Sequence, residues 1–170
     1  MQLHPVDKTL YQHRYKRVAI GLAASLAILS LSFSTVLIAL FGSSEAGSNT
    51  VLNALGVALG VAVLITALRK LRHTPYFEEV AYVWRLKQEL NQITRRMRKI
   101  KAAAEQGDAT AMLVLDFSYA GSEQLWQLDD NTLVMEDLRG WQAELDALKQ
   151  RFEVETSIKD YRRDLLKRYS

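Results

Sequence analysis

Residues 18–41 read VAIGLAASLAILSLSFSTVLIALF and residues 51–68 read VLNALGVALGVAVLITAL, and neither stretch contains a charged side chain. A helix rises about 1.5 Å per residue, so these stretches would form helices about 36 Å and about 27 Å long. The hydrocarbon core of a bilayer is about 30 Å thick. The sequence therefore predicts two transmembrane helices near the N-terminus, over residues 18–41 and 51–71.

Charged residues are distributed unevenly around this pair of helices. The N-terminal segment 1–17 is basic and positions 69–72 hold three more cations, whereas the connecting loop 42–50 holds only Glu45. Segments rich in Lys and Arg stay on the cytoplasmic side of a membrane, so we expect both termini in the cytoplasm and the loop outside. A cleaved signal peptide, with its cleavage site at Ser44-Glu45-Ala46, is disfavoured because the apolar run exceeds the usual length of about 7–15 residues.

Small side chains recur along both apolar runs at steps of three and four residues. Helices in lipid associate through close backbone approach and hydroxyl hydrogen bonds, because no hydrophobic force acts between them. The short loop favours packing of the two small faces within one chain, and homodimerisation through the second run is the alternative. No ionisable side chain lies in either run, which disfavours a channel or transporter. The residues expected at the helix–helix contact are Gly21, Ser25, Ser32, Gly56 and Gly60.

The remaining residues, 72–170, predict a polar cytoplasmic tail whose charge is asymmetric. Residues 69–101 hold ten Lys and Arg against three Asp and Glu, and residues 102–170 hold eight Lys and Arg against fourteen Asp and Glu. Mutual attraction of the two segments is the favoured explanation, and an external anionic partner is the alternative. The cations that would form such a patch are Arg95, Arg96, Arg98, Lys99 and Lys101.

Helix signals divide the tail into four elements. Thr74-Pro75 is typical of a helix start, Gly107 suits a left-handed helix exit, and Asp108 suits the N-cap of the next helix. Apolar steps of three and four then predict helices at about 75–106, 109–128, 136–153 and 157–169. We expect three of these helices to form an antiparallel bundle that the short fourth helix closes. Two helices carry a heptad seam, a stripe of apolar residues, and we expect the two seams to face each other within one chain. Pairing of the seams between two chains is the alternative. The seam residues are Val83, Leu86, Leu90, Ile93, Met97, Ile100, Leu138, Trp141, Leu145, Leu148 and Phe152.

The sequence contains no pattern typical of an active site, so we expect no catalytic activity. The chain has no cysteine, His4, His13 and His73 are not at metal-ligand spacing, and the adjacent Asp129 and Asp130 suit a turn. No phosphate-binding loop follows a predicted strand. We therefore expect no metal, no cofactor and no small-molecule substrate, and the lack of aromatic residues in the basic run argues against specific nucleic-acid binding.

Three stretches of the tail carry a family resemblance. They are EVAYVWRLKQELN at 79–91, KIKAAAEQGD at 99–108 and LDDNTL at 128–133. Together with the hairpin, they resemble an uncharacterised family of small two-span bacterial inner-membrane proteins that is known only as a domain of unknown function. The resemblance covers nearly the full length and implies an integral membrane protein without a known activity. Residues 102–121 also resemble the joint of one Sel1-like repeat, although an array would need about three copies.

These features favour an all-α protein, in which a two-helix transmembrane hairpin precedes a cytoplasmic antiparallel helical bundle with heptad-patterned helices. We expect it in a bacterial inner membrane, with both termini cytoplasmic. The expected function is a membrane-tethered protein-interaction or assembly module that contacts the bilayer and a protein partner or a second copy. The alternatives are a regulatory or accessory subunit of a larger membrane complex, and an enzyme without a recognisable motif.

Overall fold

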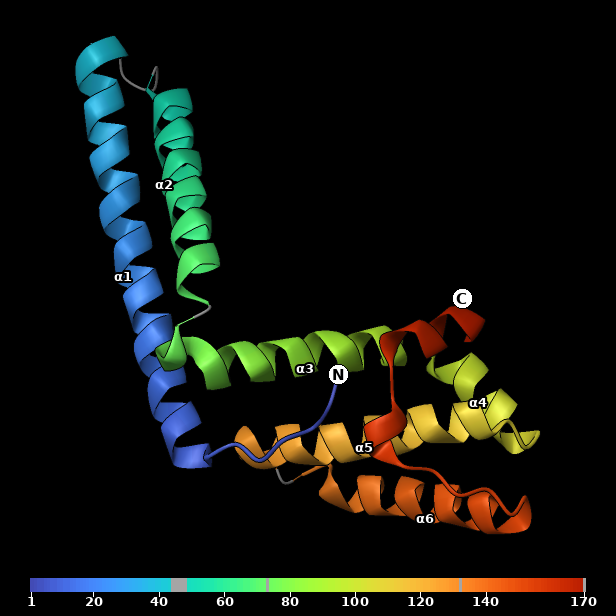
Figure 1. The fold of residues 1–170 in the computed structure, drawn as a ribbon. Coiled ribbons are helices and arrows are strands. Elements are labelled where there is room, and N and C mark those ends of the chain that lie inside the picture. The colour runs from blue at the N-terminus through green and yellow to red at the C-terminus, as the bar shows by residue number, and fades with distance from the viewer. Residues whose placement is uncertain (44–48, 73, 132, 170) are drawn as a thin grey trace. The chain divides into compact units, whose positions relative to one another are not determined.

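The structure, a computed structural model, describes residues 1–43, 49–72, 74–131 and 133–169. Helices are the regular secondary structure of these ranges, and no strand occurs in them, so the predicted all-α class is confirmed. The chain forms two compact units (Figure 1). The hairpin unit comprises Gln12–Ala81, and the bundle unit comprises Met1–Tyr11 together with Tyr82–Ser170.

The hairpin unit is built from α1 (Lys8–Phe41) and α2 (Thr50–Leu71). Both helices are long and apolar enough to cross a membrane, and only 6% and 11% of their apolar windows are buried. Large apolar side chains such as Ile20, Leu40 and Val51 are exposed, an arrangement that water disfavours and lipid accommodates. Residues 44–48 of the connecting loop, which include the cleavage site considered above, lie outside the described residues.

The two helices of the hairpin approach closely at the glycines of α2. A Cβ atom on Gly56 would lie 2.6 Å from the backbone nitrogen of Ser34, and one on Gly60 would lie 3.2 Å from that of Ser30. Only glycine permits such proximity at Gly56, because real Cβ atoms do not come within about 3 Å of a backbone nitrogen. The hydroxyl of Ser34 donates to the carbonyl oxygen of Asn53 at 3.3 Å.

The other small residues of α1 lie elsewhere. Gly21 and Ser25 line a cavity of about 300 Å³ shared with α2, and nothing lies within 4 Å of a Cβ built on Gly21. Ser32, which we expected at the helix–helix contact, is exposed instead, and Ser30 and Ser34 take that place. Hydroxyl groups are tolerated on the outer face because they satisfy themselves along the helix: Thr35 donates to the carbonyl of Leu31 at 2.8 Å.

A short connection follows α2 within the hairpin unit. The 3₁₀ helix η1 (Pro75–Phe77) leads into α3 (Glu78–Thr94). Arg14 of α1 forms an ion pair with Glu79, and its guanidinium lies 5.3 Å from the centre of the Tyr76 ring. At least one cation of the basic N-terminal segment therefore has an intramolecular partner.

The central helix of the bundle unit is α5 (Ala109–Leu128), which is buried on most sides, as expected for a helix surrounded by protein. Asp108 caps it as predicted, accepting hydrogen bonds from the backbone nitrogens of Thr110 and Ala111. The helices α4 (Met97–Glu105) and α6 (Met135–Arg151) pack directly on α5. Side chains of α3 reach α5 at Gly121, where a Cβ atom would lie 3.2 Å from Leu86 and from Leu90.

The two apolar seams therefore pack mainly on α5 rather than facing each other as we expected. In Figure 1, α5 lies between α3 and α6. The physical reason is that α5 is apolar around most of its circumference, so burying it requires a neighbour on each side. The buried seam residues are Val83, Leu86, Leu90, Ile93, Ile100, Leu138 and Leu145, those of intermediate exposure are Met97, Leu148 and Phe152, and Trp141 is 38% exposed.

The helix expected at 75–106 is divided into α3 and α4 at Arg95 and Arg96. Arg96 satisfies the end of α3 with its own side chain, because its Nη1 atom donates to the carbonyl oxygen of Gln92 at 2.9 Å. Ile93 and Ile100, seven residues apart, are both fully buried. The heptad period thus continues through the break, which explains why the apolar pattern did not reveal it.

The C-terminal segment forms two 3₁₀ helices, η2 (Ile158–Asp160) and η3 (Arg163–Tyr169), in place of the helix expected at 157–169. A 3₁₀ helix has three residues per turn, so Arg163, Leu166 and Tyr169 share one face. Leu166 and Tyr169 are buried, and Tyr169 donates a hydrogen bond to Asp108 at 3.0 Å. The hydrogen bond of Tyr169 therefore joins this segment to the N-terminus of α5.

The N-terminal segment belongs to the bundle unit, although the hairpin separates the two in sequence. The backbone nitrogen of His4 donates to the Tyr82 hydroxyl at 3.3 Å, and the His4 carbonyl accepts from Gln124 at 2.6 Å. The Tyr82 hydroxyl in turn donates to Gln124 at 2.9 Å. Lys8 and Asp130 form an ion pair further along. Residues before and after the hairpin therefore share one folded unit.

Candidate functional site

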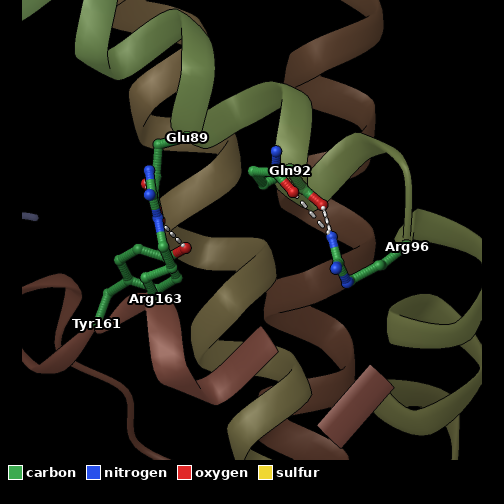
Figure 2. A network of polar contacts seen from close by, with 5 residues as sticks. All are labelled: Glu89, Gln92, Arg96, Tyr161 and Arg163. Atoms are coloured by element: carbon green, nitrogen blue, oxygen red, sulfur yellow. Dashed lines mark hydrogen bonds and ion pairs between the residues drawn. The ribbon is translucent and has the colours of Figure 1, made fainter. Parts of the chain in front are cut away.

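A buried carboxylate lies at the middle of α3 in the bundle unit. Glu89 is 2% exposed and accepts hydrogen bonds on both oxygens. Figure 2 shows it beside Tyr161 and Arg163. The Tyr161 hydroxyl donates to one oxygen at 2.7 Å, and the Arg163 Nε donates to the other at 2.8 Å, with a further contact from Arg163 Nη2. A buried charge needs such partners, because leaving water without them is costly.

The partners of Glu89 are themselves held in place. The Tyr161 ring stacks on Phe117 of α5, with the ring centres 3.8 Å apart. Burial and the hydrogen bond to Glu89 raise the pKa of the Tyr161 hydroxyl, and the hydrogen bond to Glu89 raises the pKa of Arg163. Tyr161 therefore stays neutral and Arg163 stays charged, so the carboxylate acts as a fixed acceptor that joins the C-terminal segment to α3.

A cavity of about 710 Å³ adjoins this centre. Trp84, Arg85 and Gln88 of α3 line it and are exposed, and His4 and Tyr82 form another part of its wall. The indole of Trp84 is 62% exposed, which is unusual for so large an apolar ring. This surface, Trp84 with Arg85, Gln88 and Arg163, is called the Trp84 surface below.

A second cavity, of about 410 Å³, lies at the turn between α3 and α4 and shares Gln92 with the first. Arg96 donates from Nη1 to both the carbonyl oxygen and the Oε1 atom of Gln92, at 2.9 and 3.1 Å (Figure 2). Arg96 is thus a partly buried, fixed side chain. The lining of this cavity, called the α4 cavity below, consists of Gln92, Arg95, Arg96, Arg98, Lys99 and Tyr169.

The structure distributes the five cations of the basic run over two locations. Arg95, Arg96, Arg98 and Lys99 line the α4 cavity. Lys101 lies apart from them, 5.5 Å from the centre of the Trp141 ring on α6. The acidic half of the tail supplies few partners for the basic half: Lys87 pairs with Asp129 at 2.8 Å, and within the described ranges no ion pair involves Arg95 or Arg98.

Sequence reasoning missed the centre formed by Glu89, Tyr161 and Arg163. One signal was present, because Glu89 is three residues after Leu86 and four before Ile93, which places it within the apolar stripe of α3. An acidic side chain in that position is expected to be buried, and it then needs a hydrogen-bond or ion-pair partner. The identity of the partners was not readable, since Tyr161 and Arg163 are 72 and 74 residues away in sequence.

Among the residues that the structure describes, no group of three or more His, Asp or Glu side chains is arranged to hold a metal ion. His4 instead packs on Tyr82, with the ring centres 3.7 Å apart. Asp129 and Asp130, expected in a turn, pair with Lys87 and Lys8. These side chains therefore have structural partners within the bundle unit.

Comparison with known proteins identifies a family but no individual relative. A family model described as "Protein of unknown function (DUF3087)" matches residues 1–166. No curated protein and no solved structure matches the chain. The match extends over both units and carries no activity, substrate or partner with it.

Proposed function

The chain belongs to the DUF3087 family of proteins of unknown function, and on that premise we propose that it is a membrane-anchored protein-interaction module. The hairpin would be the anchor and the bundle unit would be the interacting part. The proposal includes no catalytic role. It places the protein in a bacterial inner membrane with both termini in the cytoplasm.

Three observations support the anchor. The apolar side chains of α1 and α2 point outward rather than into a protein core. Basic residues lie at both outer ends of the hairpin, which favours a cytoplasmic position for those ends. Residues 1–11 are folded with residues 82–170, so cleavage after α1 would remove contacts such as those of His4 from the bundle unit. An intact hairpin that crosses the membrane twice agrees with all three.

The single observation that carries the interaction role is the exposed Trp84 surface. Trp and Arg are enriched among the residues that dominate protein–protein binding energies, because they offer large contact areas and several donors. Trp84 and Arg85 follow directly on a buried pair, Tyr82 and Val83, so the backbone that presents them is held by the core. A rigid helix face of this kind needs little ordering when a partner binds.

A photo-crosslinking amino acid at Gln88, four residues from Trp84, tests this role in cells that express the full chain. We expect a discrete adduct that Trp84→Ala removes, because the truncation deletes the centre of the contact surface. Leu133→Ala is the matched control, since Leu133 is 91% exposed and does not line the cavity.

The mass of the adduct separates the remaining possibilities. An adduct of twice 19.3 kDa identifies a second copy of the chain as the partner. A heterologous adduct that survives purification in detergent identifies a stable subunit of a larger complex. Equal crosslinking in the Trp84→Ala chain, or no adduct in native membranes, would contradict the proposal.

A further inference from the structure

We propose that the α4 cavity binds a phosphate group of an anionic ligand, either a phospholipid headgroup or a soluble phosphate compound. This inference is independent of the interaction role of the Trp84 surface. It concerns a cavity of about 410 Å³ whose lining includes four cationic side chains and no carboxylate.

The charge of the cavity is the first argument. Arg95 and Arg98 are both exposed, and neither has an ion-pair partner in the described part of the chain. Like charges that line one cavity repel each other, and the repulsion is relieved when an anion enters. Two acidic residues of the tail pair with lysines outside the cavity: Asp129 with Lys87, and Asp116 with Lys149.

The geometry of Arg96 is the second argument. Its Nη1 atom is fixed by two hydrogen bonds to Gln92, while its Nε atom is buried and has no partner within the described residues. A guanidinium held in this way is already ordered, so it loses little entropy when it donates to phosphate oxygens. Figure 2 shows Arg96 beside Gln92 at the end of α3.

The turn itself is the third argument. Because α3 ends at Thr94 and α4 begins at Met97, the turn places Arg95 and Arg96 directly before the N-terminus of a new helix. No side chain caps this N-terminus, and its positive dipole end adds to the field of the cations. Tyr169 also lines the cavity, and its hydrogen bond to Asp108 holds it in place.

Phosphate is favoured over nucleic acid for a structural reason. Binding of single strands uses exposed aromatic rings on which bases stack. The aromatic ring that lines the α4 cavity, Tyr169, is 6% exposed and therefore not available for stacking. Arginine forks recognise the phosphate group itself and require no base.

Calorimetric titration of the full chain in a neutral detergent, at constant ionic strength, tests the proposal with pyrophosphate as the soluble probe. A parallel titration uses short-chain phosphatidylglycerol, with short-chain phosphatidylcholine as its uncharged reference. The Arg95→Gln/Arg98→Gln double variant removes two cavity charges. The Arg139→Gln/Lys159→Gln double variant removes two exposed charges elsewhere, which also lack an ion pair in the described chain.

Of the two probes, we consider whichever binds the unchanged chain. We expect the cavity variant to bind that probe at least about tenfold more weakly, the usual effect of losing a charged hydrogen bond. The affinity of the control variant should stay within about twofold of that of the unchanged chain. Binding of pyrophosphate identifies a soluble ligand, and binding of phosphatidylglycerol alone identifies a lipid headgroup. The proposal is overturned if neither probe binds, if both variants lose binding equally, or if a single-stranded oligonucleotide binds and neither phosphate probe does.

Discussion

At the scale of single residues, Glu89 shows how a charge is kept inside this small bundle. The carboxylate is 2% exposed, but the side chain of its ionic partner Arg163 is 65% exposed. Water therefore screens one end of the pair, so the ion pair alone contributes little to the free energy of unfolding. The buried hydrogen bond from Tyr161 has no such screening, so its loss leaves a carboxylate oxygen short of a partner inside the protein.

Replacing Tyr161 with Phe should lower the free energy of unfolding by about 1–3 kcal/mol, the usual cost of an unsatisfied buried group. Tyr119→Phe is the matched control. Tyr119 is 5% exposed and burial raises its pKa to about 12, but its hydroxyl has no hydrogen-bond partner in the described chain. Urea denaturation of the full chain in detergent, followed by tryptophan fluorescence, measures both. Equal losses in the two variants would show that the bond to Glu89 contributes nothing specific.

At the scale of elements, the hairpin depends on two glycines of α2, one helical turn apart, that are not equivalent. Gly56 lies against backbone atoms of Ser34, which cannot rotate away, whereas Gly60 leaves slightly more room at Ser30. Gly21 of α1 faces open space. These differences rank the three positions by the space available for a methyl group.

Gly56→Ala should therefore weaken the hairpin most, by about 1–3 kcal/mol for overpacking against backbone, and Gly60→Ala should weaken it less. Gly21→Ala is the control and should be neutral. Thermal unfolding in detergent, monitored by circular dichroism, gives the ranking. Helix propensity favours alanine over glycine, so a destabilisation of the same size at Gly21, where a Cβ atom meets nothing within 4 Å, would show that close packing of the two helices does not govern the result.

At the scale of the whole molecule, the bundle unit contains the chain on both sides of the hairpin. Segments that pack together lie on the same side of a membrane, so the proposed anchor would cross it an even number of times. The proposal that this side is the cytoplasm rests on the uneven distribution of Lys and Arg. These two arguments are independent, since one uses contacts and the other uses charge.

The proposed topology predicts the labelling of single cysteines, for which the chain provides no background because it contains none. Cysteine introduced at Ser43, in the connecting loop, should react with a membrane-impermeant thiol reagent in intact cells. Cysteine introduced at Leu133, which is 91% exposed, should react only after the cells are opened. Labelling of Leu133→Cys in intact cells would contradict the proposed topology, because it would place the bundle unit outside the cytoplasm.

Much of the architecture was determined by the sequence alone, because its signals are local. Uncharged runs of 24 and 18 residues predicted the two long apolar helices, and Asp108 with Gly107 predicted the start of α5. Heptad spacing identified Leu86, Leu90 and Ile93 as inward-facing residues of α3. Such features depend on helical period and on capping, both of which act over a few residues.

Tertiary structure alone decided which surfaces meet. The period is the same on either side of Arg95, so only packing of α4 on α5 reveals the break that forms the α4 cavity. The Glu89 centre joins residues 72 and 74 positions apart, and the docking of residues 1–11 bridges more than a hundred. Contacts of this kind depend on how the apolar faces of several helices are buried together, and a local sequence pattern does not indicate which helices will pack.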